Sequence, residues 1–359
     1  MNCRLASSII LVVILLVATD IANANAKPPL WKLYLTTSDK WPPISSTVAE
    51  DIVALPDPTV TDPELTKLGE ALFQFTGLSK NNEISCASCH RRGAAFSDPS
   101  RVSIGVEGKQ GTRNSPSLLN ADLWKVLFWD ARATDLSAQA LEPLTHANEM
   151  GSSPQLAEQR VKENEKLMAL WRNAYSSNEV LWPKMANALA EFQRSLRGRE
   201  SNFDHFYKAV NAGDTDKAKA VINDEQLLGL HVYRTKANCV ACHNGALFSD
   251  QKLHNTGLHY FGRKFEDLGV YWLSNNPSDM GKFRTPMLRH LNQTSPWMHN
   301  GLFDDLRGII RMYAHGGARP RRPKNLPAMM AYPETSPILK PFSLTKEEEN
   351  ALISFLKTL

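Results

Sequence analysis

Two five-residue segments constrain this chain more than any other feature. They read "CASCH" at residues 86–90 and "CVACH" at residues 239–243, so each has the form C-x-x-C-H. This spacing is the attachment signature of c-type haem, in which the two thiols form thioether bonds with the porphyrin. The histidine that follows is placed to give the iron its proximal nitrogen. The sequence therefore predicts two covalently bound haems, attached through Cys86, Cys89 and His90 and through Cys239, Cys242 and His243.

Three other roles for paired cysteines fit less well. A zinc ribbon places its second pair roughly 15 to 20 residues after the first, whereas Cys239 lies 150 positions after Cys89. A thioredoxin-like pair requires no histidine at that position, and a disulfide across two residues is strained. With 10 histidines in 359 residues, a chance histidine after both pairs has odds of about one in a thousand.

The first 26 residues have the composition of a cleaved signal peptide. Arg4 precedes an apolar run over residues 6–18, and "ANA" at 24–26 supplies small residues for cleavage. A membrane anchor is the alternative, but this run is shorter than the roughly 20 residues that span a bilayer. Cleavage would remove Arg4 and Asp20 together and leave the formal charge at +4 without a basic tract. This balance argues against nucleic acid as a partner, and no later segment is apolar enough to insert stably in a membrane.

The chain also repeats itself around the two motifs. The same short phrases recur in the same order in both halves. They are "LGEALF" at 68–73 and "LGLHVY" at 228–233, "FSD" at 96–98 and 248–250, "RNSPSL" at 113–118 and "RTPML" at 284–288, "FWD" at 128–130 and "PWMHNG" at 296–301, and "DL" at 135–136 and 305–306. Shared turn chemistry explains one such match, but five in order indicate an internal repeat.

The repeat predicts a mainly α fold with two cytochrome c-like haem domains joined by helical segments at about 154–225. We expect a signal peptide over 1–26, an N-terminal haem domain over 27–225 and a C-terminal haem domain over 226–359. Asp62 and Pro63 have the residue types of an N-cap and a first helical position, and residues 182–196 show the spacing of a core helix. "TKEE" at 345–348 predicts a capping box that opens a C-terminal helix.

The two halves differ where a second axial ligand is expected. The position seven residues after the leucine of "DL" is Pro143 in the first half and Tyr313 in the second. Proline cannot ligate iron, whereas tyrosinate can. The sequence thus predicts one haem with a free face and one with ligands on both faces. Two alternatives stay open, namely that Tyr313 is a core aromatic residue of an amphipathic helix and that Met312 is the ligand instead.

With these motifs, residues 55–358 resemble the bacterial di-haem cytochrome c peroxidase and MauG family. The resemblance implies that the first haem reacts with hydrogen peroxide and the second transfers electrons. It also implies a distal pocket at the first haem built from Gln139, Pro143 and Glu149, with Trp129 between the haems. Residues matching Asn114, Thr294 and Pro296 bind a calcium ion in the family, and oxygen ligands suit that hard cation.

Two departures place the chain closer to the MauG branch of this family. The peroxidase type holds a histidine on a loop after the first haem, but "SDPSRVSIGVEGKQG" contains none, and Val106 stands at the expected place. The second haem of those peroxidases uses methionine, where this chain offers Tyr313. The MauG branch oxidises tryptophan side chains of a partner protein.

We therefore expect a peroxide-dependent oxidoreductase in which Glu149 moves the peroxide proton and Trp129 relays charge. Hydrogen peroxide and a redox partner protein would be its partners, and the periplasm its location, because haem attachment of this kind takes place there. Two alternatives remain. One is a cytochrome c peroxidase supplied with electrons by a small cytochrome or cupredoxin, and the other is an electron-transfer cytochrome without turnover.

Overall fold

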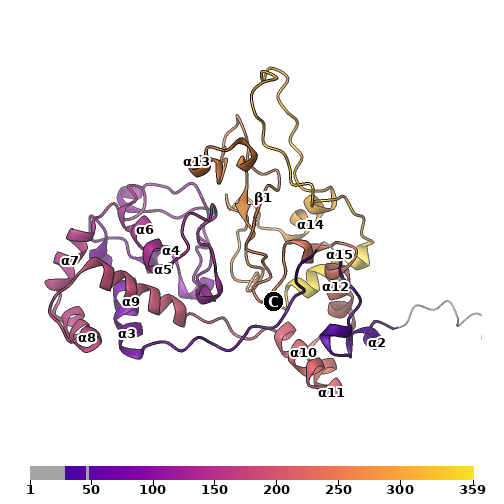
Figure 1. The fold of residues 1–359 in the computed structure, drawn as a ribbon, viewed down its shortest axis with the longest axis horizontal. Helices are drawn as coiled ribbons and strands as arrows, with labels where there is room; N and C mark the ends of the chain where they lie inside the picture. Colours follow the sequence, from indigo (N-terminus) through magenta and orange to yellow (C-terminus); the bar gives the residue numbers. More distant parts are fainter. Residues whose placement is uncertain (1–28, 46–47) are drawn as a thin grey trace, which may run out of the picture.

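Helices carry most of the regular structure, and strands contribute two short segments. The computed structural model describes residues 29–45 and 48–359, so the expected signal peptide lies outside the described residues. The expectation of a mainly α fold is confirmed. Figure 1 shows two helical lobes side by side, the first built from the earlier part of the chain and the second mainly from the later part.

The N-terminal lobe contains seven α-helices around one hydrophobic core. They are α3 (Pro63–Gln74), α4 (Cys86–Cys89), α5 (Leu136–Gln139), α6 (Leu141–Thr145), α7 (Pro154–Lys162), α8 (Glu165–Tyr175) and α9 (Trp182–Ser195). The expected core helix at 182–196 is confirmed as α9, which buries eight side chains against α3 and its neighbours. The first C-x-x-C-H motif occupies α4 and the residue after it.

The C-terminal lobe has its own core and includes segments from two parts of the chain. Its elements are α2 (Leu30–Tyr34), α10 (Asn202–Asn211), α11 (Thr215–Val221), α12 (Asp224–Arg234), α13 (Tyr271–Ser274), α14 (Leu306–Ala314), α15 (Lys346–Leu356) and the antiparallel strands β1 (Leu253–His254) and β2 (Phe283–Arg284). Tyr34, Phe203 and Phe206 are buried in this core beside Leu230 and Phe355. The expected domain boundary after residue 225 stays a prediction, but the packing places residues 30–52 and 203–222 with the second lobe.

The internal repeat is visible in the way the two main helices of each lobe cross each other. Gly69 of α3 lies against α9, where an added Cβ would fall 1.9 Å from the Ala188 carbonyl oxygen. Gly229 of α12 lies against α15 in the same way, with the Ala351 carbonyl 2.0 Å from such a Cβ. A side chain at either position would collide with backbone, so glycine sets the close approach of both helix pairs.

Turn residues with left-handed backbone occur at matching places in the two lobes. The matching pairs are Phe96 (φ 55°) with Phe248 (φ 52°), Asn120 (φ 59°) with His290 (φ 62°), and Phe128 (φ 65°) with Met298 (φ 69°). Non-glycine residues seldom adopt this conformation, so its recurrence supports a shared backbone path. The last pair aligns Trp129 with His299, and the rings of these two residues contact each other at 6.3 Å between centroids.

The helix caps expected from the sequence are confirmed. Asp62 accepts hydrogen bonds from the first turn of α3, with Pro63 as the first helical residue. Thr345 and Glu348 form the capping box of α15. In the repeated "DL" phrase, Asp135 and Asp305 cap α5 and α14 through their carboxylates. The N-terminus of the helix that carries Tyr313 is therefore fixed by a side chain.

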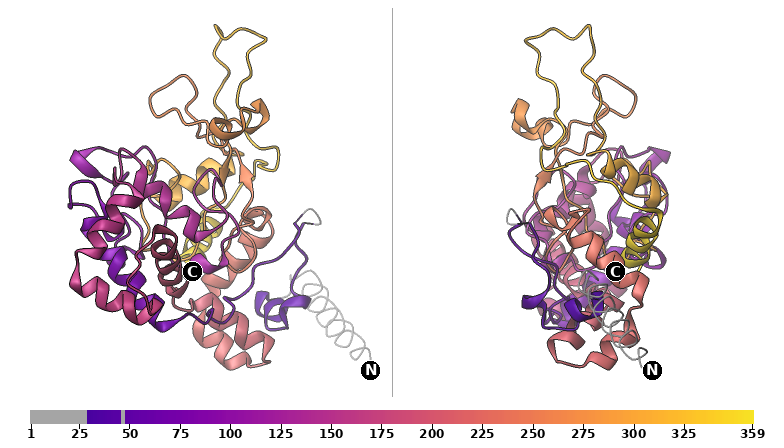
Figure 2. Two further views of the ribbon diagram at one scale, coloured as in Figure 1. Left: turned by 60° about the vertical axis from the view of Figure 1, so that its left-hand side comes forward. Right: turned by 90° about the vertical axis from the view of Figure 1, so that its right-hand side faces the viewer.

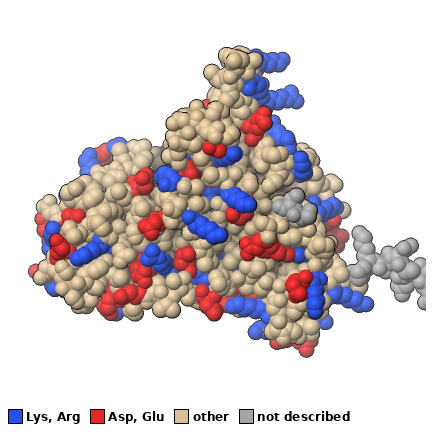
Figure 3. All heavy atoms as spheres, viewed as in Figure 1, with Lys and Arg blue, Asp and Glu red and all other residues tan. Residues whose placement is uncertain are grey.

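One long arm, residues 316–343, leaves the C-terminal lobe after α14 and returns before α15. Figure 2 shows the arm extending beyond the rest of the lobe in both views. Figure 3 shows Lys and Arg side chains gathered along it, and Arg319, Arg321, Arg322 and Lys324 lie on its surface. Among the described residues, no helix is both long and apolar enough to cross a membrane.

Candidate functional site: two cavities with a shared wall

Each C-x-x-C-H motif lines a separate cavity. The first has a volume of about 550 Å³ and is lined by Cys86, Cys89 and His90 together with Gln139, Pro143 and Glu149. The second has a volume of about 280 Å³ and is lined by Cys239, Cys242, His243 and Tyr313. The structure thus brings together the residues that the sequence predicted for each haem.

Both motif histidines present the same nitrogen for ligation. Nδ1 of His90 lies 3.0 Å from the Phe96 carbonyl oxygen, and Nδ1 of His243 lies 2.9 Å from the Phe248 carbonyl oxygen. A carbonyl only accepts, so Nδ1 carries the proton and Nε2 keeps its lone pair. Burial lowers the pKa of both imidazoles and favours this neutral form. Such an outer hydrogen bond is typical of metal-ligating histidine.

The cysteines also fit haem attachment. All four are free rather than joined in disulfides. Burial, reinforced by the second cysteine of the pair, raises the pKa of Cys86 and of Cys239 to about 12. These two are protonated thiols of half-buried residues that line a cavity, and thioether formation with a vinyl group would consume them. The residues present therefore fit one covalently bound c-type haem in each cavity.

Glu149 is one of the acidic residues that line the first cavity, on the side expected to be distal to the haem. Gln139 ends α5, Pro143 lies in α6, and Glu149 follows on the loop after it. Burial raises the pKa of Glu149, while His146 and Arg132 oppose the increase. The carboxyl group of Glu149 therefore holds its proton to a higher pH than an exposed glutamate does.

In the loop beside Glu149, Val106 occupies the position at which the resemblance to the peroxidases would place a capping histidine. Val106 is buried, and its N–H donates to the Glu149 carbonyl at 2.8 Å. Gly105 packs so closely on this segment that an added Cβ would lie 2.1 Å from the Asn148 carbonyl oxygen. The loop thus supports the backbone of Glu149 and supplies no ligand over the cavity.

The distal side of the second cavity carries the Tyr313 phenol. Burial, followed by the nearby thiols of Cys242 and Cys239, raises the pKa of Tyr313 well above its ordinary value. A phenol in these surroundings ionises only if a strong Lewis acid compensates the cost. Met312, the rival ligand, lies one position away on α14 and does not line either cavity. The assignment of Tyr313 as ligand stays a prediction that this geometry supports.

A shared wall separates the two cavities. Trp129 is buried, lines both cavities and donates from Nε1 to the Asn114 carbonyl at 2.8 Å. Trp124 and Arg284 line both cavities as well. Residues 114–117 line both cavities too. Trp129 thus lies between the two cavities, and its place between two bound haems stays a prediction.

The three residues proposed to bind calcium lie at the edge of this wall. Asn114, Thr294 and Pro296 all line the second cavity. Asn114 donates from its amide nitrogen to the Ser100 and Arg101 carbonyls at 3.3 Å, which leaves its side-chain oxygen as an acceptor. Within the described residues, no backbone N–H is bonded to the Thr294 or Pro296 carbonyl. The donor set suits a hard cation, and calcium binding stays a prediction.

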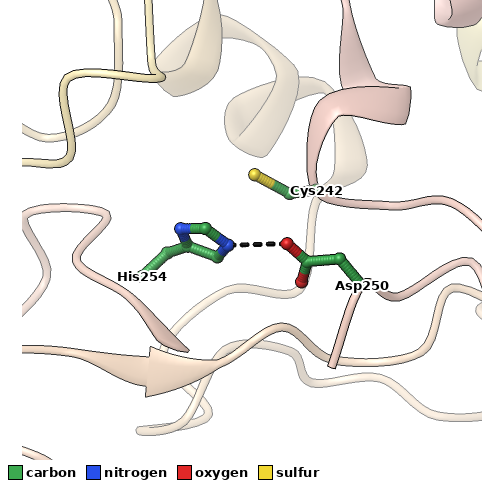
Figure 4. Close-up of side chains that lie close together, drawn as sticks. All are labelled: Cys242, Asp250 and His254. Carbon is green, nitrogen blue, oxygen red and sulfur yellow. Dashed lines mark hydrogen bonds and ion pairs between the residues drawn. The ribbon is translucent and has the colours of Figure 1, made fainter. Parts of the chain in front are cut away.

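The sequence reasoning did not identify an Asp–His pair beside the second motif. Nε2 of His254 lies 2.8 Å from the Asp250 carboxylate, and Figure 4 shows Cys242 facing this pair. Burial alone would lower the pKa of His254, but Asp250 and the Cys242 thiol outweigh it and raise the pKa to about 10. The three groups lie close enough to hold a metal ion. The predicted thioether bond to haem would remove Cys242 from that role, and His254 lines the second cavity beside it.

A buried ion pair joins the two lobes next to the wall. Arg113 of the first lobe contacts Asp130 at 2.5 Å and reaches Asp267 of the second lobe at 2.7 Å. Both carboxylates are buried or nearly so. Burial raises the pKa of Asp267, but hydrogen bonds from Arg113 outweigh it and hold the pKa below the ordinary range.

The fold and the two cavities define a di-haem cytochrome of the c type. A family model described as di-haem cytochrome c peroxidase matches residues 63–212. Cytochrome-c peroxidase IdrP2 of Pseudomonas sp. (strain SCT) is 31% identical over 336 residues, which cover 86% of this chain and 84% of the relative. Methylamine utilization protein MauG of Methylorubrum extorquens is 32% identical and covers 83% of this chain and 78% of its own.

A solved structure shows the same architecture. A MauG-like protein associated with microbial copper homeostasis superposes with a TM-score of 0.74 at 28% identity, covering 85% of this chain and 93% of that one. The chain belongs to the di-haem cytochrome c peroxidase and MauG family. It is accordingly a haem oxidoreductase, and membership implies two c-type haems.

Proposed function

We propose that the protein is a MauG-type oxidoreductase that reacts with hydrogen peroxide at its N-terminal haem site and oxidises a partner protein or another large reductant. The observation that carries this proposal is the difference between the two distal sides. The first cavity has Pro143, which cannot ligate iron, together with Gln139 and Glu149, whereas the second has Tyr313 at the position that matches Pro143. When bound, the first haem supplies the iron at which the peroxide O–O bond is cleaved.

Glu149 is the acid/base group of the proposed reaction. Its carboxylate accepts the proton of the inner peroxide oxygen and returns it to the outer oxygen, which leaves as water. Such a positioned group contributes about 10² to 10⁴ in rate. Gln139 lines the same cavity and offers its amide as a hydrogen-bond partner for the outer oxygen.

Trp129 and Tyr313 support the transfer between the two sites. The indole of Trp129 lies in the wall common to both cavities, so it shortens any electron path between them. A tyrosinate at the second site favours the oxidised state more than methionine does. This favours storage of an oxidising equivalent over rapid acceptance of electrons from a small high-potential donor. We place this reaction in the periplasm, where c-type haem attachment occurs.

The purified ferric protein tests the proposal directly. We expect one high-spin and one low-spin haem signal in electron paramagnetic resonance, and rapid loss of the ferric signals on addition of one equivalent of hydrogen peroxide. Two low-spin signals that do not respond to peroxide would reduce the protein to an electron carrier. Fast turnover of peroxide with a reduced small cytochrome or cupredoxin would instead support the cytochrome c peroxidase function, which the names of several relatives carry.

A further inference from the structure

Arg284 is a buried cation at the junction of the two cavities. It lies in β2, is 5% exposed, and lines both cavities. Its backbone N–H donates to the Trp129 carbonyl at 2.7 Å, and its Nε donates to the Phe128 carbonyl at 3.0 Å. The guanidinium carbon lies 3.5 Å from the centre of the Trp124 ring. These contacts fix the side chain within the shared wall.

This guanidinium has no anionic partner among the described residues. Its Nη1 is buried and makes no hydrogen bond. The other fully buried arginines differ, because Arg234 pairs with Asp51 and Arg289 with Asp204. Arg113, on the other side of the wall, has two carboxylates. Burial without a counter-ion lowers the pKa of Arg284 to about 9.

A buried charge of this kind requires compensation. An unpaired ion in the protein interior is strongly destabilising, and the cation–π contact with an aromatic ring offsets only part of that cost. The bidentate partner that suits a guanidinium is a carboxylate. The c-type haem that each cavity fits carries two propionate carboxylates, and Arg284 makes no ion pair with the acidic residues that line the first cavity.

We propose that Arg284 binds a haem propionate and that this carboxylate is its missing counter-ion. Either haem can supply this carboxylate, because Arg284 lines both cavities. The cation then raises the reduction potential of the haem whose propionate it binds, because reduction adds negative charge that the guanidinium stabilises. The inference rests on the two bound haems and is independent of the peroxide reaction.

The test is a redox titration of the di-haem protein that follows the two haems separately by their high-spin and low-spin spectra. Arg284→Gln is expected to lower the reduction potential of one haem while both haems stay attached. The haem that shifts identifies the source of the propionate. Lys282→Gln is the matched control. It removes the same charge only two residues from Arg284, but the Lys282 side chain lines neither cavity. The control is expected to leave both potentials unchanged.

A second variant covers the case in which Arg284→Gln does not fold. Arg284→Lys keeps the charge but loses the planar fork, so the propionate bending band in resonance Raman spectra is expected to shift while the potential changes less. Both potentials unchanged in a fully haem-loaded Arg284→Gln protein would overturn the proposal. An unchanged propionate band in Arg284→Lys would overturn it as well. Neither readout depends on peroxide turnover, so a protein without peroxidase activity would still test it.

Discussion

At the first site, the proposed reaction with peroxide depends most on the single residue Glu149. Glu149→Gln keeps the size of the side chain and removes its ability to accept a proton. We expect the rate of reaction with hydrogen peroxide to fall by about 10² to 10⁴ with both haems retained. Stopped-flow absorbance after mixing with peroxide measures this rate. Glu142→Gln is the control, because Glu142 lines the same cavity but pairs with Arg132, whose Nε lies 3.4 Å from its carboxylate.

The same residue predicts a pH dependence. In the proposed reaction the carboxylate form of Glu149 accepts the peroxide proton, and burial raises the pKa of Glu149 above the ordinary 4.5. The peroxide rate is therefore expected to decrease as the pH falls through this raised pKa, and to decrease at a higher pH than an exposed glutamate would give. The pH profile of Glu149→Gln should lack this acid limb. A limb that persists unchanged in the variant would assign it to another group.

Tyr313 is expected to determine the ligand field of the second haem. Tyr313→Met should keep both haems and raise the reduction potential of the second, because methionine stabilises the reduced state more than tyrosinate does. Tyr313→Phe should leave that haem five-coordinate and high-spin. Electron paramagnetic resonance and redox titration measure both effects. If Met312→Leu removes the low-spin signal and Tyr313→Phe keeps it, Met312 is the ligand.

At the scale of single residues, the sequence predicts the residues of the C-x-x-C-H motifs and those at matching positions of the two repeats. The attachment residues and the difference between Pro143 and Tyr313 follow from spacing alone. Arg284, Trp124 and the Asp250–His254 pair do not, because their significance lies in burial and in which cavity they line. A histidine four residues after the repeated "FSD" aspartate was the available signal for that pair.

The tight helix crossings contribute to the stability of each lobe. Gly69→Ala places a methyl group against the Ala188 carbonyl, so the helices α3 and α9 must separate. We expect a loss of about 1–3 kcal/mol in the free energy of unfolding, since overpacking a tight contact costs this much. Gly229→Ala should act similarly on α12 and α15. Thermal or urea denaturation followed by circular dichroism measures the loss.

Gly93→Ala provides the matched control, since an added Cβ there meets no atom within 4 Å. It is expected to change the stability little. Equal stability of Gly69→Ala and Gly93→Ala would show that the crossing is less tight than described. Among the elements, α3, α9, α12 and α15 follow from periodicity and caps. The assignment of α10 and α11 to the second core does not, because it depends on contacts between distant segments such as Phe203 with Phe248 and Phe355.

The two lobes are held together in part by the buried pair of Arg113 and Asp267. Asp267→Asn leaves Arg113 with Asp130 alone, and removing one partner of a buried pair costs about 3 kcal/mol or more. Because Arg113 lowers the pKa of Asp267, the pair's stabilisation is present above pH 3.8, the ordinary value, and is lost as the pH falls through the lowered pKa.

Urea midpoints measured between pH 3 and pH 7 test this relation. The parent protein is expected to lose more stability on acidification than Asp267→Asn does, because the variant lacks the titrating carboxylate. Glu334→Gln, at an exposed position on the arm, should follow the parent. If Asp267→Asn has the same urea midpoint as the parent at pH 7, the pair of Arg113 and Asp267 does not help to hold the lobes together.

The matched glycine crossings and the matched left-handed turns have one consequence for how such a molecule changes over generations. When a unit is duplicated within one chain, both copies keep the same glycine crossings and turns. Most substitutions at these positions destabilise either copy. Positions 143 and 313 stand outside this restriction, because each lines only its own cavity, and can vary alone. Two unlike reactivities can thus arise from one duplicated framework by exchanging a single side chain.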